Sequence, residues 1–152
     1  MRLKFVLIAV LAALTCSGLS GRLPERGDEP ADPFPLNSVW QGTMEQSKPK
    51  SSYPVILFVK QRQGDTFEGM TWYPTLGNGL LEVTGRVDAK GAVTFTEDKV
   101  IYGEVHGKDM VVVAGSKYTA KLEKSALKGS GEWTDPKTNQ TAALTFSLRL
   151  AE

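Results

Sequence analysis

Over most of the chain, apolar and polar residues alternate in short stretches that end at turn residues. The alternation is strict over 81–88 (LEVTGRVD) and over 144–150 (LTFSLRL). A period of two is typical of a β-strand with one buried face. The pair at 64–65 (GD) suits a two-residue hairpin turn, and Gly91 suits the left-handed position of a three-residue turn. We therefore predict an all-β domain of about eight to ten strands over 38–152.

Hairpins that recur about every dozen residues favour an up-and-down antiparallel meander. Closing the meander into a β-barrel removes the unpaired edge strands that promote aggregation. The alternative is a two-sheet sandwich with Greek-key crossovers, which needs a long connection. The only stretch that could supply such a long connection is 98–117. Its sequence fits two strands, 100–105 and 110–114, around a turn at 106–109, but it also fits one strand followed by a long loop. We therefore predict the barrel.

The first residues have the pattern of an export signal. Arg2 and Lys4 precede the apolar run 5–14 (FVLIAVLAAL), and small residues follow it. The run is shorter than the ~20 residues that a membrane-spanning helix needs. We expect 1–20 to be a helical signal peptide, and the mature protein to be periplasmic, attached to the cell envelope or extracellular.

Cys16 is the only cysteine of the chain, and two fates are open for it. A lipoprotein signal would end just before Cys16 and leave this residue lipidated, which would attach the protein to a membrane. The residues before it fit that signal poorly, since Leu14 and Thr15 stand directly before the cysteine, where small residues are typical. Simple cleavage between Ser17 and Ser20 is therefore the favoured alternative. A lipid anchor at Cys16 would be the only membrane contact that we expect.

Composition narrows the classes of partner. Removing Arg2 and Lys4 with the leader leaves 18 − 2 = 16 basic residues against 17 acidic ones, a net charge of −1. A nucleic-acid-binding protein would carry a clustered positive charge, so we expect no nucleic-acid partner. The stretch 21–37 (GRLPERGDEPADPFPLN) has four prolines, many charges and no periodicity. Such a composition predicts a flexible, disordered tether between the leader and the barrel.

Few side chains suit catalysis or metal binding. His106 is the only histidine and lies in a predicted turn, where we expect it on the surface, and no Gly-x-Ser-x-Gly elbow presents a nucleophile. One histidine and no mature thiol cannot form a zinc site of usual composition. Strand alternation places most of a set of carboxylates on the outer face. The set is Glu68, Glu82, Asp88, Glu97 and Asp98. We expect no catalytic residue, no metal site and no cofactor.

The aromatic residues are better candidates for a binding site. Flat rings at one mouth of the barrel could hold a small apolar or sugar-like ligand. The candidate ligand-binding residues are Trp40, Trp72, Tyr73, Tyr118 and Trp133. The alternative is that these rings fill the core, and this is favoured because side chains nearly fill a barrel of about eight strands. Gly129 and Gly131 face inward and leave room for a cavity.

Three short motifs carry a resemblance to known barrels. They are Trp40-Gln41-Gly42 and two related stretches, 67–74 (FEGMTWYP) and 127–136 (LKGSGEWTDP). With the meander pattern they resemble the calycin-type barrels of the lipocalin and avidin-like families. The lipocalin signature has glycine two residues before the tryptophan, where this chain has Ser38.

The resemblance implies the barrel architecture and supplies no biotin contacts. The chain is most similar to small uncharacterised exported bacterial proteins with the same W-x-G, F-x-G and G-x-W motifs, a group that implies no activity.

The sequence therefore predicts an exported, non-enzymatic β-barrel that acts as a binding or interaction module for a small ligand or a protein partner. A first alternative is a hydrolase of an envelope or extracellular polymer that uses carboxylates at the barrel mouth. A second is an envelope spacer without a ligand.

Overall fold

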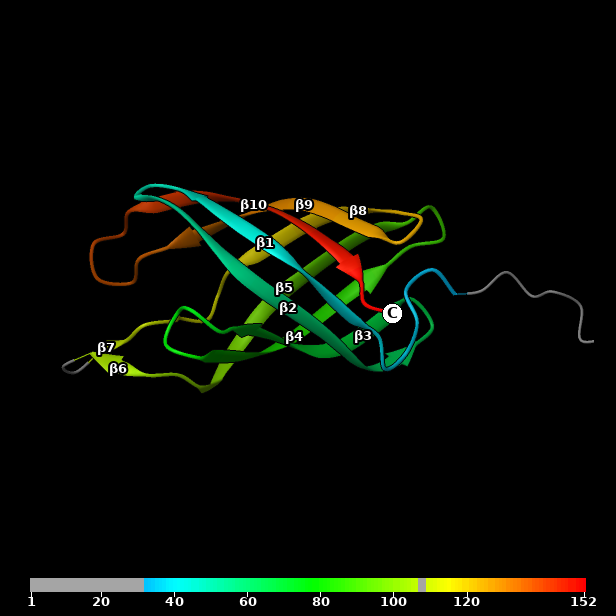
Figure 1. Ribbon diagram of the computed structural model, residues 1–152, viewed down its shortest axis with the longest axis horizontal. Helices are drawn as coiled ribbons and strands as arrows, with labels where there is room; N and C mark the ends of the chain where they lie inside the picture. Colours follow the sequence, from blue (N-terminus) through cyan, green and yellow to red (C-terminus); the bar gives the residue numbers. More distant parts are fainter. Residues whose placement is uncertain (1–31, 107–108) are drawn as a thin grey trace, which may run out of the picture. The chain divides into compact units, whose positions relative to one another are not determined.

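The computed structural model describes residues 32–106 and 109–152, which contain a closed antiparallel β-barrel (Figure 1). The predicted signal peptide (1–20), Cys16 and most of the predicted tether lie outside the described residues. The barrel strands are β1 (Val39–Ser47), β2 (Lys50–Gln63), β3 (Thr66–Tyr73), β4 (Gly79–Val87), β5 (Ala92–Tyr102), β8 (Lys117–Glu123), β9 (Ala126–Thr134) and β10 (Thr141–Leu150).

Each barrel strand pairs with the next one along the chain, and β1 pairs with β10 to close the sheet. The prediction of an all-β up-and-down barrel is therefore confirmed, with eight barrel strands. The architecture is consistent with a calycin-type meander barrel. Within the described residues, no helix is long and apolar enough to cross a membrane.

Two further short strands lie between β5 and β8. They are β6 (Val105–His106) and β7 (Asp109–Met110), which pair as a separate hairpin beyond the barrel (Figure 1). The stretch 98–117 thus combines the two readings of its sequence, since it forms a small hairpin at 105–110 and an irregular segment at 111–116. It supplies no Greek-key crossover.

The alternation of residues explains the barrel interior. Val93 and Phe95 of β5 and Leu144 and Phe146 of β10 face inward and are buried, and the residues between them face out. Gly42 lies where β1 meets β10, and a Cβ there would come within 2.0 Å of the Ser147 carbonyl oxygen. Glycine in the W-x-G motif therefore lets the last strand approach the first.

One end of the barrel is plugged by a residue of the predicted tether. Phe34 is fully buried, stacks on Trp40 with ring centroids 5.3 Å apart, and meets the edge of Phe67 at 4.9 Å. Arg62 Nη1 donates a hydrogen bond of 2.8 Å to the Phe34 carbonyl oxygen. The last residues of the 21–37 stretch therefore belong to the folded domain. A single aromatic residue among prolines has no periodicity, so the alternation pattern could not detect it.

The other end carries the longer connections. The connections β3–β4, β5–β8 and β9–β10 lie there, together with the tight turn between β1 and β2 (Figure 1). The room expected over Gly129 and Gly131 does not exist, because a Cβ at Gly131 would meet the Tyr118 ring at 2.4 Å and one at Gly129 would meet Phe146 at 2.6 Å. Neighbouring aromatic rings occupy that space. Any cavity must therefore lie nearer the loops.

Candidate functional site

Glu97 is the only charged side chain that is buried among the described residues, with 2% of its surface exposed. It continues the inward series of Val93 and Phe95 along β5, so its carboxylate points into the barrel. The other four carboxylates of the predicted outer set are exposed, as the alternation indicates. The same alternation, extended by one pair of residues, would have placed Glu97 inside.

Hydroxyl groups surround the Glu97 carboxylate. Thr71 Oγ1 and the Tyr73 hydroxyl donate to Oε1 over 2.6 Å and 2.5 Å, and the Tyr118 hydroxyl donates to Oε2 over 3.0 Å. The Ser116 hydroxyl also donates to this carboxylate. We call these five residues the Glu97 cluster. It joins β3, β5 and β8 with the segment that precedes β8.

Burial and charge shift the titration of this cluster. Loss of hydration raises the pKa of Glu97, and the hydroxyl donors, which favour the ionised form, oppose that rise only in part. Burial and the nearby Glu97 charge hold the pKa of Tyr73 and Tyr118 well above the usual value. The same two causes raise the pKa of Tyr53 to about 12. The tyrosines therefore remain protonated hydrogen-bond donors at neutral pH.

A cavity of ≈ 150 Å³ adjoins the cluster at the loop end of the barrel. Glu97, Tyr73 and Ser116 contribute to its wall, together with the half-buried Trp133 of β9. The rest of the lining is Gln46, Leu76, Leu81, Val111, Val112, Val113 and Leu144. The cavity is thus mainly apolar, with one carboxylate in its wall.

The segment 111–116 crosses this end of the barrel and limits the cavity. Its Val112 is buried, and a Cβ at Gly79 would come within 2.4 Å of the Val112 side chain. Two backbone hydrogen bonds hold the segment against β5: Gly115 N–H donates to the Glu97 carbonyl over 2.7 Å, and Glu97 N–H donates to the Ser116 carbonyl over 3.0 Å. The backbone of Glu97 therefore anchors the segment whose residues line the cavity.

The structure separates the five candidate aromatic residues. Trp40 is fully buried at the plugged end, where its Nε1 donates to Ser38 Oγ over 2.9 Å. Tyr73 and Tyr118 lie in the Glu97 cluster, and Trp133 lines the cavity. Trp72 follows the outer face of β3, because neighbouring residues of a strand point to opposite sides. Trp72 and Tyr73 therefore cannot line one site.

Trp72 belongs to an apolar row on the outside of the barrel. It pairs with Ile56 of β2 on one side and with Leu80 of β4 on the other. Leu80 pairs in turn with Tyr102 of β5, which is 59% exposed. The row crosses four strands, and no described element covers Tyr102.

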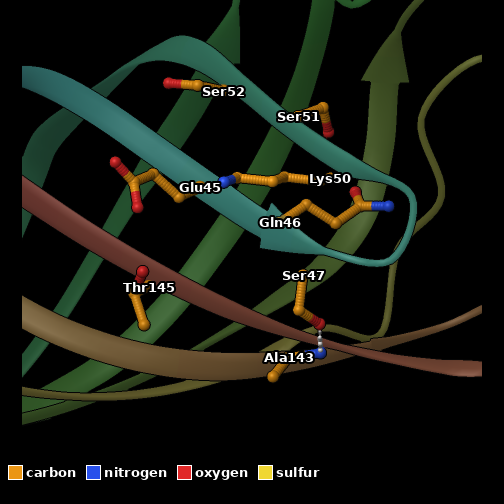
Figure 2. Close-up of a pocket in the computed structure, with 8 residues that line it drawn as sticks. All are labelled: Glu45, Gln46, Ser47, Lys50, Ser51, Ser52, Ala143 and Thr145. Carbon is orange, nitrogen blue, oxygen red and sulfur yellow. Dashed lines mark hydrogen bonds between the residues drawn. The ribbon is translucent and has the colours of Figure 1, made fainter.

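A second hollow, of ≈ 670 Å³, lies over the outer faces of β1, β2 and β10 (Figure 2). Figure 2 shows its polar and charged side chains, which include Glu45 and Lys50, and Ser47 Oγ accepts a hydrogen bond of 3.1 Å from the Ala143 N–H. Apart from the half-buried Gln46, its lining residues are exposed. No buried polar group converges on it, so this larger hollow offers less for specific recognition than the cavity beside Glu97.

His106 lies at the end of β6, where its backbone pairs with Asp109. Within the described residues, no three His, Cys, Asp or Glu side chains gather in a way that could hold a metal ion. The residue that sequence reasoning missed is Glu97, together with its partners Thr71 and Ser116. A charged residue at an inward position of a strand is the signal that identifies it.

Comparison with known proteins adds no assignment to this geometry. No family model, no curated protein and no solved structure matches the chain.

Proposed function

We propose that this protein is an exported, non-enzymatic binding module that holds a small ligand at the loop end of its barrel. The observation that carries the proposal is the cavity of ≈ 150 Å³ with a buried carboxylate in an otherwise mainly apolar wall. A cavity of about 150 Å³ is large enough for a molecule the size of benzene. Apolar walls with a few convergent polar groups are typical of small-molecule sites.

The two ends of the barrel differ in a way that supports this proposal. Phe34, Trp40 and Phe67 pack together at one end, so aromatic rings fill the barrel interior there. At the other end, Trp133 is only half-buried and 111–116 is irregular. Irregular segments on a rigid scaffold often carry binding residues. We therefore place the ligand among the connections of the loop end.

The chemistry of the cavity favours binding over hydrolysis. Polymer hydrolysis of the glycosidase type uses two carboxyl groups about 5–10 Å apart. Glu97 is the only acidic residue that lines the cavity among the described residues, and its two oxygens already accept bonds from hydroxyl groups. Glu68, Glu82 and Asp98 occupy exposed positions of the strands. We therefore propose a binding role rather than a catalytic one.

The location of the protein is proposed from the sequence. The basic, apolar and small-residue regions of 1–20 support export. The W-x-G, F-x-G and G-x-W motifs support a resemblance to small exported bacterial proteins that share them. Lipidation at Cys16 remains a proposal, and intact-mass analysis of the cell-associated protein tests it, because acylation adds a defined mass.

Native mass spectrometry of the protein purified from its own cells tests the binding function. We expect a bound small molecule in the wild type and in Trp72→Ala, which alters only the outer face. We expect its loss in Trp133→Ala, which removes one wall of the cavity. An empty wild-type protein that also binds nothing in a screen of benzene-sized compounds would support the spacer alternative instead.

A further inference from the structure

We infer that the ligand of the loop-end cavity is a small organic cation, with a positively charged amine near Glu97 and an apolar body of about the size of a benzene ring. This inference rests on the proposed binding function and adds the chemical class of the ligand. It is carried by a buried carboxylate that lines a cavity and has no cationic partner among the described residues.

The first step concerns the charge on Glu97. Its oxygens accept hydrogen bonds from Thr71, Tyr73, Tyr118 and Ser116. An ionised carboxylate only accepts hydrogen bonds, so all four hydroxyls can donate to it. A protonated carboxyl must donate its own proton, and at least one hydroxyl would then have to turn and accept. The hydroxyl groups around Glu97 therefore favour the anion, while burial raises the pKa of the carboxyl overall.

The second step concerns the missing counter-charge. Buried charges are normally paired, because moving an isolated ion out of water is costly. Arg62 pairs with Asp32 and Arg86 pairs with Asp65, and neither ion pair involves Glu97. None of the residues that line the cavity is lysine, arginine or histidine. Hydroxyl dipoles thus compensate this anion, and no lysine, arginine or histidine lines the cavity beside it.

The third step concerns the other residues that line the cavity. Trp133 and Tyr73 contribute aromatic rings to the lining, and aromatic faces attract organic cations. Leu76, Leu81 and Leu144 supply apolar surface for the rest of the molecule. A neutral apolar ligand would use only this surface and leave the carboxylate without a counter-charge. An anionic ligand would be repelled by it.

Isothermal titration calorimetry with two matched probes tests the inference. Benzylamine is a cation at pH 7, and benzyl alcohol is its neutral analogue of nearly the same shape. We expect benzylamine to bind the wild-type protein at least tenfold more tightly than benzyl alcohol. We expect Glu97→Gln to weaken the affinity for benzylamine at least tenfold and to change the affinity for benzyl alcohol by less than twofold. The matched control is Glu82→Gln on the outer face, which should leave both affinities unchanged.

The outcomes separate this inference from the proposed function. Equal binding of the two probes to the wild type, or tighter binding of the alcohol, would overturn the cationic ligand while leaving a binding module. Absence of binding by both probes, together with an empty protein in native mass spectrometry, would overturn both. Far-UV circular dichroism shows whether Glu97→Gln folds. If it does not, the difference between the affinities of the wild-type protein for benzylamine and for benzyl alcohol decides whether the ligand is a cation.

Discussion

Phe34 should contribute to the stability of the barrel as a core residue, although it follows a proline-rich, charged stretch. Its side chain is fully buried between Trp40 and Phe67, and the Arg62 guanidinium lies 5.9 Å from its ring centroid. Truncation of a buried phenylalanine to alanine typically costs about 3–5 kcal/mol. We expect the lower part of this range, about 3 kcal/mol, for Phe34→Ala, because the plug lies at the barrel end and its neighbours can partly close the space.

Urea unfolding, followed by tryptophan fluorescence, measures this loss. A protein of this size has a urea slope of about 2 kcal/mol/M, so the midpoint should fall by about 1.5 M. Leu36→Ala is the matched control, because Leu36 lies in the same segment but is 52% exposed. Exposed substitutions usually change stability by less than about 0.5 kcal/mol. The reasoning is wrong if Phe34→Ala and Leu36→Ala unfold at the same urea concentration.

Three further predictions concern Glu97, the contact between β1 and β10, and the core residue Trp40. Burial raises the pKa of Glu97 in the folded protein above its value in the unfolded chain. The contribution of Glu97 to the free energy of unfolding should therefore be complete below the unfolded pKa and be lost as the pH rises through the folded pKa. The loss should be about 1.4 kcal/mol for each unit by which the folded pKa exceeds the unfolded one. Urea unfolding at several pH values should show this decline in the wild type and not in Glu97→Gln; parallel pH profiles would contradict it. Gly42→Ala should destabilise the barrel by about 1–3 kcal/mol in calorimetry, because its Cβ would strike the Ser147 carbonyl, and an unchanged melting temperature would refute that contact. Trp40→Ala should cost about 3–5 kcal/mol in urea unfolding, clearly more than Trp72→Ala, since only Trp40 is fully buried; equal losses would contradict the assignment of faces.

The strand pattern of the sequence was sufficient for the architecture. Strict alternation in 81–88 and 144–150 reflects one buried face, and short turns leave little choice of topology. The pattern could not resolve 98–117, because β6 and β7 have two residues each and such pairs give no periodicity. The burial of Phe34 could not be predicted for a similar reason. A lone aromatic residue is buried by tertiary contacts that local sequence does not encode.

The candidate site was predicted only in part. Tyr73 and Trp133 do line a cavity, but Trp72 faces outward, as its position next to Tyr73 in a strand requires. Glu97 could have been placed inside by counting in twos from Phe95. The general expectation that carboxylates are exposed outweighed that count. The position of Ser116 could not be predicted, because it depends on an irregular segment that folds back over β5.

The most direct test of the central claim is the NMR titration of the Glu97 side-chain carboxyl, with and without benzylamine. A bound cation beside an anionic Glu97 stabilises the ionised form, so its pKa should fall when benzylamine is present. Benzyl alcohol at the same concentration should produce no such fall. A Glu97 pKa that does not respond to saturating benzylamine would contradict the account of a carboxylate that binds a cationic ligand at the loop end of the barrel.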